Sequence, residues 1–269
     1  MSQRPVVLIT GVSSGIGRAI AEALVQRDFH VFGTVRSHSA APPPGVEPVQ
    51  LDVRDDASVR AAIDGLIART GRIDALINNA GGSLVGAIEE TDLGEAQALF
   101  DLNFFGAVRV TRAVLPHMRA QQSGRILFLS SVVGFLPAPF MGFYAASKHA
   151  LEGYAESLDH EVRGFGVRVA LIEPVFMKTA IDKNSTAVAR PLEAYRATRE
   201  RVAAGINKSV ESAEDPAVVA SVVLRALTDK RRRLRYRAGK GSGLLAALRS
   251  FLPAGTFDRS LRKQFGLDA

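Results

Sequence analysis

A glycine-rich turn near the amino terminus constrains the fold of this chain more than any other segment. Residues 10–17 read T-G-V-S-S-G-I-G and stand between the apolar run at 6–9 and a helical pattern at 18–25. A strand, a glycine-rich turn and a helix, in that order, form the usual context of a dinucleotide site. The glycines let the backbone approach a pyrophosphate, and the helix amino terminus supplies free N–H groups. We therefore predict a nucleotide-binding turn that comprises Gly11, Ser13, Ser14, Gly15, Ile16 and Gly17.

Strands and helices alternate along the rest of the chain. Apolar strands are predicted at 30–35, 46–51, 73–77, 124–131 and 167–172, with helices at 57–68, 95–118 and from 144 through 158. Short connections between them indicate a parallel, doubly wound sheet with helices on both faces. The expected fold is a single α/β (Rossmann) domain of about seven strands over residues 1–240, with a helical extension at 241–269 that packs on it.

The composition excludes several kinds of site. The 269 residues include no cysteine, so disulfides, thiolate metal sites and cysteine nucleophiles are excluded. The five histidines lack ligand spacing, and no metal site is predicted. No apolar run reaches the roughly eighteen residues that span a membrane, and no secretory segment precedes the first strand. We expect a cytoplasmic protein.

The net charge of +7 raises the question of a nucleic-acid partner. Much of the excess positive charge lies in the last forty residues, while the first two hundred mix both signs. At 233–238 apolar and basic residues alternate, a pattern typical of a half-buried edge strand. We expect Arg233, Arg235 and Arg237 to face solvent there, where they deter aggregation. No nucleic-acid partner is predicted.

The end of the second strand bears on the choice of cofactor. An NAD-binding chain usually carries an acid here, about 20 residues after the turn, that holds the ribose 2′-hydroxyl. The candidate positions hold Val35 and Arg36 instead. A guanidinium suits a 2′-phosphate, so NADP(H) is predicted over NAD(H), with Arg36 as the contact. The alternative is that Arg36 is an ordinary surface arginine.

Three polar residues stand out in the predicted helices. Tyr144 and Lys148 are spaced i, i+4 and therefore share a helix face. A neighbouring cation favours the phenolate and lowers a tyrosine pKa from about 10 toward the range useful for acid/base work. In isolation such a pair is more often an ordinary pair of helical neighbours. Asn103 lies in an apolar helical stretch, where its low helix propensity is unfavourable, and it could be a core amide.

Taken in order, these motifs resemble the short-chain dehydrogenase/reductase family. They are T-G-x-x-x-G-I-G at 10–17, N-N-A-G at 78–81, Asn103, Ser131, and Tyr144-x-x-x-Lys148, and they span about residues 6–179. Ser131 precedes Tyr144 by thirteen positions, which matches the usual spacing in the family, whereas Ser130 does not.

The resemblance implies a catalytic tetrad. Tyr144 would exchange a proton with the reacting oxygen, and Ser131 would hydrogen-bond that oxygen. Lys148 would lower the pKa of Tyr144 and hold the nicotinamide ribose. Asn103 would hold a water in a proton relay. Further cofactor contacts are implied at Asp52, Val53, Asn79, Ala80, Gly81, Pro174 and Thr179. Val175 replaces the usual glycine after Pro174, and with Phe176 it would add apolar surface near the nicotinamide.

Two segments beyond the motifs bear on the substrate. Residues 180–212 are predicted to form a lid, in which Tyr195 is expected to pack or face solvent rather than meet a ligand. The apolar, arginine-rich tail at 241–269 resembles the carboxyl-terminal segments of relatives that act on steroids, retinoids and other lipids. The tail could cap the pocket, contact a second subunit or lie on an anionic membrane. Pocket or subunit packing is favoured.

The leading hypothesis is an NADP(H)-dependent oxidoreductase that transfers a hydride between the nicotinamide and an apolar ketone, aldehyde or secondary alcohol. The alternatives are a 3-oxoacyl-thioester reductase of lipid synthesis and a non-catalytic, cofactor-sensing regulator. Because members of the family commonly form dimers and tetramers, a homodimer or homotetramer is expected.

Overall fold

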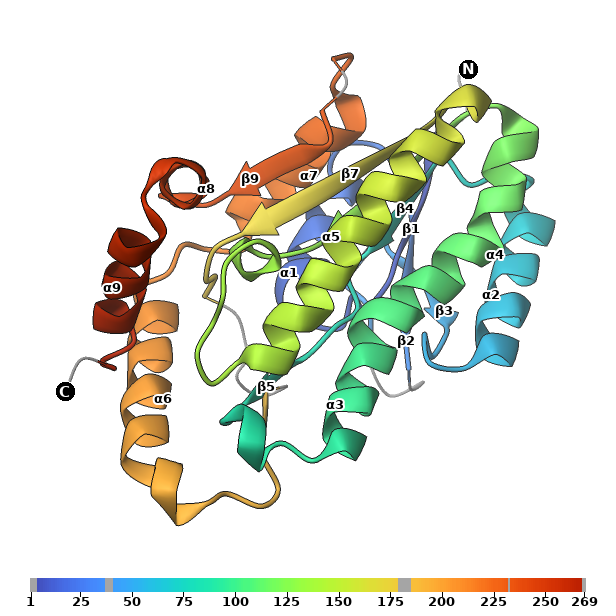
Figure 1. Ribbon diagram of the computed structural model, residues 1–269. Helices are drawn as coiled ribbons and strands as arrows, with labels where there is room; N and C mark the ends of the chain where they lie inside the picture. Colours follow the sequence, from blue (N-terminus) through green and yellow to red (C-terminus); the bar gives the residue numbers. More distant parts are fainter. Residues whose placement is uncertain (1–3, 37–40, 179–184, 232, 268–269) are drawn as a thin grey trace.

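The computed structural model describes residues 4–36, 41–178, 185–231 and 233–267, which form a three-layer α/β fold (Figure 1). Seven parallel strands form the central sheet in the order β3-β2-β1-β4-β6-β7-β9. Their bounds are Val6–Ile9 (β1), His30–Val35 (β2), Glu47–Gln50 (β3), Ala75–Asn78 (β4), Gly124–Leu129 (β6), Val167–Pro174 (β7) and Arg235–Ala238 (β9). The predicted doubly wound sheet is confirmed. Its strand order reverses beside β1, and such a switch point opens a crevice at the carboxyl ends of the strands.

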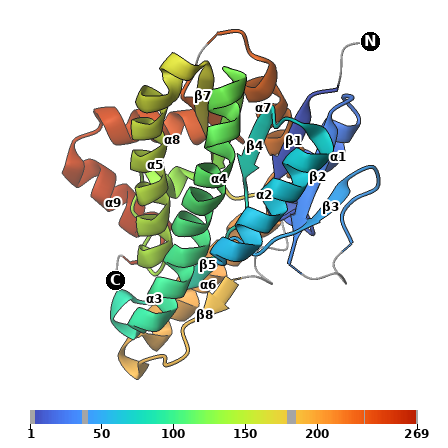
Figure 2. The ribbon, with the colours of Figure 1, turned by 90° about the vertical axis from the view of Figure 1, so that its right-hand side faces the viewer.

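Helices cover both faces of the sheet. Their bounds are Gly15–Val25 (α1), Asp56–Thr70 (α2), Leu93–Phe100 (α3), Gly106–Gln121 (α4), Gly142–Val162 (α5), Arg196–Glu211 (α6), Ala217–Thr228 (α7), Ser242–Phe251 (α8) and Ala254–Gln264 (α9). In Figure 2, α2, α4 and α5 lie side by side on one face. Their apolar residues form one core cluster with that face, and α1 and α7 form the other. The apolar strand runs are therefore buried on both sides, as a parallel sheet requires.

The helix predicted at 95–118 is interrupted. A π turn, Asp101–Phe105, joins α3 to α4 and places Asn103 at its centre, with the side chain buried. The wider turn accommodates a residue of low helix propensity without ending the helix, and π turns often occur at functional sites.

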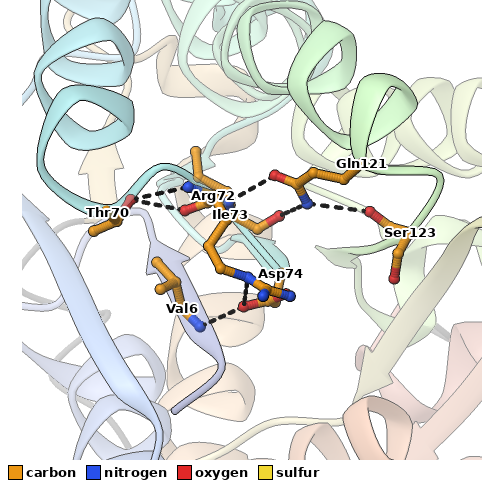
Figure 3. Close-up of polar contacts among 7 residues, drawn as sticks. All are labelled: Val6, Thr70, Arg72, Ile73, Asp74, Gln121 and Ser123. Carbon is orange, nitrogen blue, oxygen red and sulfur yellow. Dashed lines mark hydrogen bonds and ion pairs between the residues drawn. The ribbon is translucent and has the colours of Figure 1, made fainter. Parts of the chain in front are cut away.

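Side-chain hydrogen bonds connect the amino-terminal ends of the strands, on the side of the sheet opposite the crevice (Figure 3). The backbone N–H of Val6 donates to Asp74 Oδ2 at 2.7 Å, and Asp74 also forms an ion pair with Arg72. Gln121, the last residue of α4, bonds both the N–H and the carbonyl of Ile73 at 3.0 Å. These bonds tie the start of β4 to β1 and to α4, and so fix the strand that carries residues 78–81 into the crevice.

The edge strand corrects one expectation. β9 pairs with β7 in the predicted position, and Tyr236 and Ala238 are buried. Arg233 and Arg237 are exposed, as expected, whereas Arg235 is half-buried. The Nε atoms of Arg235 and Arg237 lie 2.9 Å and 3.5 Å from the carboxylate of Glu173, whose side chain is fully buried. The prediction was wrong for Arg235, because alternation shows which residues share a face, not what packs on that face.

The lid and the tail pack beside the crevice. In the lid, β8 (Ser185–Ala187) pairs in parallel with β5 (Ser83–Val85), and α6 follows. In the tail, Phe257 of α9 packs with Val132 and Leu136 of the loop after β6. Among the described residues, no helix combines the length and apolar character needed to cross a membrane.

Candidate active site

A cavity of about 530 Å³ opens at the carboxyl ends of the central strands. Residues that follow β1, β2, β4, β6 and β7 all contribute to its walls. The cavity therefore occupies the crevice where the strand order reverses, the usual ligand position in such sheets. The predicted residues that line it are Gly11, Ser13, Ser14, Gly15, Ile16, Gly17, Arg36, Val53, Asn79, Ala80, Gly81, Ser131, Tyr144, Lys148 and Pro174.

The glycine-rich turn forms one end of the cavity. Gly11 and Gly15 adopt positive φ angles of 74° and 58°, which favour glycine. A Cβ on Gly17 would lie 2.1 Å from the carbonyl oxygen of Gly11 and 2.4 Å from Asn79 Nδ2. The Asn79 amide donates to the carbonyls of Thr10 and Gly11, both at 2.9 Å. The turn is thus closely packed, and the side-chain amide of Asn79 holds two of its carbonyls.

The amino terminus of α1 faces the same end of the cavity. Its N-cap residue, Ser14, makes no side-chain capping bond, and no acidic residue occupies the first turn. The first N–H groups and the positive end of the helix dipole are therefore free for an anion. Together with the glycine packing, this geometry fits the pyrophosphate of a dinucleotide.

The adenosine end differs from expectation at Asp52. Arg36 is exposed at the end of β2, and both it and Val53 line the cavity. Asp52 does not line the cavity, because its carboxylate accepts from Arg54 Nε at 3.1 Å and Nη2 at 2.7 Å. These bonds lower the pKa of Asp52 to about 2, with Arg36 a smaller influence. Thr179 lies outside the described residues, so its implied contact stays a prediction.

Helix α5 presents Tyr144 and Lys148 to the middle of the cavity. Lys148 Nζ lies 5.8 Å from the centre of the Tyr144 ring and donates to the Leu129 carbonyl at 2.8 Å. Ser131 follows β6, and its hydroxyl lies against Tyr144. That hydroxyl also accepts from the N–H of Val133 at 3.3 Å. The hydroxyl, the phenol and the ammonium therefore converge, as the motif order predicts.

The pKa values of the pair depart from the expected direction. Burial raises the pKa of Tyr144 to about 12, and the hydroxyl of Ser131 opposes this rise. Burial also lowers the pKa of Lys148 to about 8, against the effect of Glu152. The expected lowering of the tyrosine pKa by Lys148 is wrong for this structure, because desolvation dominates and the ammonium bonds the Leu129 carbonyl. A neutral phenol at neutral pH is a proton donor.

Asn103 lies behind the cavity wall. Its Nδ2 donates to the carbonyl of Gly82 and to Ser147 Oγ, both at 3.0 Å, and its Oδ1 accepts from the N–H of Gly82 at 2.8 Å. A Cβ on Gly81 would lie 3.1 Å from the same Oδ1 and 3.8 Å from Lys148 Nζ. Both amide donors are therefore engaged in fixing the turn after β4 beside Lys148. The implied water relay stays a prediction, and these donors are not free to serve it.

The other end of the cavity is apolar, and several of its residues were not predicted. The lining there includes Val85, Val133, Met141, Val175, Phe176, Met177, Ile206 and Val210. Val175 and Phe176 were expected. Ile206 and Val210 share one face of α6 with Val202, and this i, i+4 spacing in the predicted lid was the available signal. Tyr195 does not line the cavity, and its hydroxyl donates to Glu89 Oε2 at 2.6 Å.

Known proteins resemble the chain over most of its length. The family model for short chain dehydrogenase matches residues 5–189. A 3-ketodihydrosphingosine reductase of Bacteroides thetaiotaomicron is 34% identical, over 97% of each chain. The 17-beta-hydroxysteroid dehydrogenase type 1 of mouse is 36% identical, over 93% of this chain and 78% of that protein. The structure of a short-chain dehydrogenase from Streptomyces avermitilis, 35% identical, superposes with a TM-score of 0.82 over 98% of this chain and 99% of that one.

Two other structural neighbours contain a cofactor. A short chain dehydrogenase/reductase from Burkholderia phymatum, 27% identical with a TM-score of 0.79 and 92% coverage of each chain, was solved with NAD. A short chain dehydrogenase from Burkholderia cenocepacia was solved with NADP; it shares the fold at 23% identity, with a TM-score of 0.77 over 96% of this chain and 98% of that one. With the glycine-rich turn, the ordered motifs and the family match, this chain belongs to the short-chain dehydrogenase family of oxidoreductases.

Proposed function

We propose that the protein is an NADP(H)-dependent oxidoreductase that interconverts an apolar ketone or aldehyde and a secondary or primary alcohol. One observation carries this proposal. The Ser131 hydroxyl, the Tyr144 phenol and the Lys148 ammonium lie in one cavity, between the glycine-rich turn and an apolar end lined by α6. A cofactor held by its pyrophosphate at the turn would extend toward these groups, and the remaining space would accept an apolar substrate.

The side chains have separable roles in this proposal. The nicotinamide, when bound, supplies or accepts the hydride. The protonated Tyr144 gives its proton to the carbonyl oxygen, and Ser131 hydrogen-bonds the same oxygen and holds it near the phenol. Lys148, within 5.8 Å of the Tyr144 ring, stabilises the negative charge that the phenol acquires. The phenol of Tyr144 is protonated at neutral pH, which is the form that carbonyl reduction requires.

The lining favours a neutral substrate. Among the described residues of the cavity wall, the only ionisable groups besides Tyr144 are Arg36 at the adenosine end and Lys148. No described carboxylate lines the apolar end to balance an amine. The mouse steroid dehydrogenase acts on a neutral apolar molecule by its name, whereas a 3-ketodihydrosphingosine carries an amine. We therefore infer a neutral, steroid-like or similarly bulky carbonyl.

An NADPH-oxidation screen tests the substrate class. The panel contains steroid, retinoid, small aromatic, long-chain keto amine and 3-oxoacyl-thioester carbonyls. We expect the highest kcat/KM with neutral apolar ketones. Turnover confined to acyl thioesters would support the alternative role in lipid synthesis. Tight NADPH binding without turnover of any carbonyl would instead indicate a cofactor-sensing regulator.

Cofactor choice gives a prediction for Arg36. Replacing Arg36 with alanine is expected to raise the Kd of NADPH about tenfold or more and to change that of NADH less than about twofold, because a charge-assisted bond to the 2′-phosphate is lost. Binding is measured by the enhancement of nicotinamide fluorescence. Arg54→Ala is the matched control, since Arg54 bonds Asp52 and does not line the cavity. Equal losses for the two cofactors would argue against a 2′-phosphate contact.

A buried ion pair anchors the lid. Glu90, whose side chain is fully buried, forms an ion pair with Arg199 of α6. Glu90 also accepts from the N–H groups of Ala87 and Leu192, at 2.9 Å and 2.8 Å. These contacts join the segment after β5 to the connection between β8 and α6 and to the first turn of α6. Because α6 supplies Ile206 and Val210 to the cavity, the anchor also fixes the apolar wall.

Removal of the anchor is expected to loosen the lid. Arg199→Met leaves Glu90 without its counter-charge, so local opening of residues 185–211 becomes easier and KM rises about tenfold. Faster proteolysis within this segment provides the structural measurement. Arg196→Met is the control, because Arg196 pairs only with the exposed Glu193 among the described residues. Identical KM and cleavage rates in both variants would contradict the anchor.

A further inference from the structure

A buried carboxylate lies one helical turn beyond Lys148. Glu152 and Lys148 are 5% and 6% exposed and share the inner face of α5. Glu152 Oε2 pairs with Arg235 Nη2 at 3.0 Å. Its other oxygen, Oε1, lies beside the hydroxyl of Ser130, the neighbour of Ser131. In the part of the chain that the structure describes, neither Oε1 nor the Ser130 hydroxyl reaches hydrogen-bond geometry with any group. One oxygen of the carboxylate is therefore held by Arg235, and the other faces the loop that carries Ser131.

Glycine at position 134 creates the space for this arrangement. A Cβ there would lie 2.5 Å from Ser130 Oγ and 2.9 Å from Glu152 Oε1. Both atoms are buried, so neither could retreat into solvent. The loop after β6, which carries Ser131, thus packs directly on the carboxylate of Glu152.

Charged groups of β9 and α5 lie around Glu152. Arg235 on β9 pairs with Glu152, Glu156 and Glu173, and Arg237 is a second partner of Glu173. Glu156 is partly exposed, and burial raises the pKa of Glu173 to about 7, so the three carboxylates are not all fully charged at neutral pH. The ammonium of Lys148 is a further cation that acts on Glu152, because the two groups are coupled electrostatically. A buried cluster is stable only when its charges are compensated.

The groups that face Lys148 come from α5, β6 and the turn after β4. On α5 they are Tyr144 and Glu152. From β6 its ammonium donates to the carbonyl of Leu129, and in the turn after β4 it lies 3.8 Å from where a Cβ on Gly81 would be. Among these groups of the described residues, Glu152 is the only carboxylate. Arg235 pairs with Glu152 and also with Glu156 and Glu173.

We propose that Glu152, held in place by Arg235, is a positioning residue that keeps Lys148 charged beside Tyr144. The proposal rests on the function proposed above for that pair. Burial alone lowers the pKa of Lys148, and Glu152 opposes the fall. Burial also raises the pKa of Glu152, which Ser130 and Arg235 oppose. The edge strand therefore maintains the charge of the carboxylate, and the carboxylate maintains the charge of the lysine.

The sign of the pH effect follows directly. A negative charge near Lys148 and Tyr144 makes both groups harder to deprotonate. Glu152→Gln removes that charge with little change in shape, so deprotonation occurs at lower pH. We expect the basic limb of the pH profile of kcat/KM for carbonyl reduction to move down by about one pH unit. Glu156→Gln is the matched control, because Glu156 pairs with the same Arg235 but is partly exposed.

A second measurement does not depend on turnover. In cofactor-free protein labelled with ¹³C at lysine Cε, the Lys148 resonance is identified by its absence from Lys148→Arg. We expect its titration midpoint to fall in Glu152→Gln and to stay unchanged in Glu156→Gln. Equal midpoints in Glu152→Gln and the native protein would overturn the proposal. If no carbonyl is turned over, the proposed function fails while the resonance still decides whether Glu152 controls Lys148.

Discussion

Replacement of Tyr144 with phenylalanine is expected to lower kcat about a thousandfold or more, while the Kd of NADPH changes less than about threefold. A positioned proton donor contributes about 10²–10⁴-fold to a rate, and no other described phenol or acid lines the cavity to replace it. The ring remains after this change, so its packing in the cluster with Val202 and Ile206 is retained. The loss should therefore fall on the chemical step rather than on cofactor binding.

The measurement compares single-turnover reduction with cofactor binding in the same preparation. Tyr154→Phe is the matched control, because Tyr154 is on the same helix but packs its ring 5.9 Å from those of Phe104 and Phe128, away from the cavity. It should reduce the best carbonyl of the screen at the native rate. Full turnover by Tyr144→Phe would remove Tyr144 from the proposed mechanism.

Gly17→Ala is expected to raise the Kd of NADPH at least about a hundredfold. The added Cβ would overlap the Gly11 carbonyl and the Asn79 amide, at 2.1 Å and 2.4 Å, so the turn must open and lose its hydrogen bonds. The loss of several bonds to a charged group exceeds the roughly 2.7 kcal/mol that a hundredfold change requires. The glycine thus matters for the space it leaves, since its φ angle is not in the positive range.

Gly65→Ala provides the comparison for that variant. Gly65 is also helical, on α2, and a Cβ there would meet nothing within 4 Å among the described residues. This change should leave the Kd of NADPH unaltered and stabilise the fold by about 0.5–1 kcal/mol through helix propensity. Calorimetric binding and thermal unfolding of both variants separate the two effects. A native Kd for Gly17→Ala would exclude the turn as the pyrophosphate site.

The sequence was sufficient for features that are local or that recur in order. The turn at 10–17, the pair on α5 and Ser131 could be found because short spacings on known elements place them at one edge of the sheet. Asp52 could not be judged in this way. Arg54 lies only two positions away, but the sequence does not show whether the carboxylate of Asp52 points into the cavity or bonds the guanidinium of Arg54. That choice depends on side-chain conformation.

Features that depend on contacts between distant segments could not be predicted from residue spacing. The direction of the Tyr144 pKa depends on how much protein surrounds the phenol, and spacing on a helix does not report that. Arg235 and Glu152 are 83 positions apart, so nothing in the alternation of β9 indicated the carboxylates opposite. The domain bounds, the oligomeric state and the cytoplasmic location stay predictions.

The last strand of the sheet has a consequence for the order in which this enzyme becomes competent. β9 pairs with β7 across sixty residues of intervening chain, and such long-range parallel pairing is slow because a large loop must close first. During synthesis the turn, Tyr144 and Lys148 all emerge long before Arg235. A nascent chain can therefore form the nucleotide-binding turn before Arg235 is in place beside Glu152 to maintain the charge of Lys148. Catalytic competence would then be acquired in the final step of folding, when the carboxyl-terminal strand is in place.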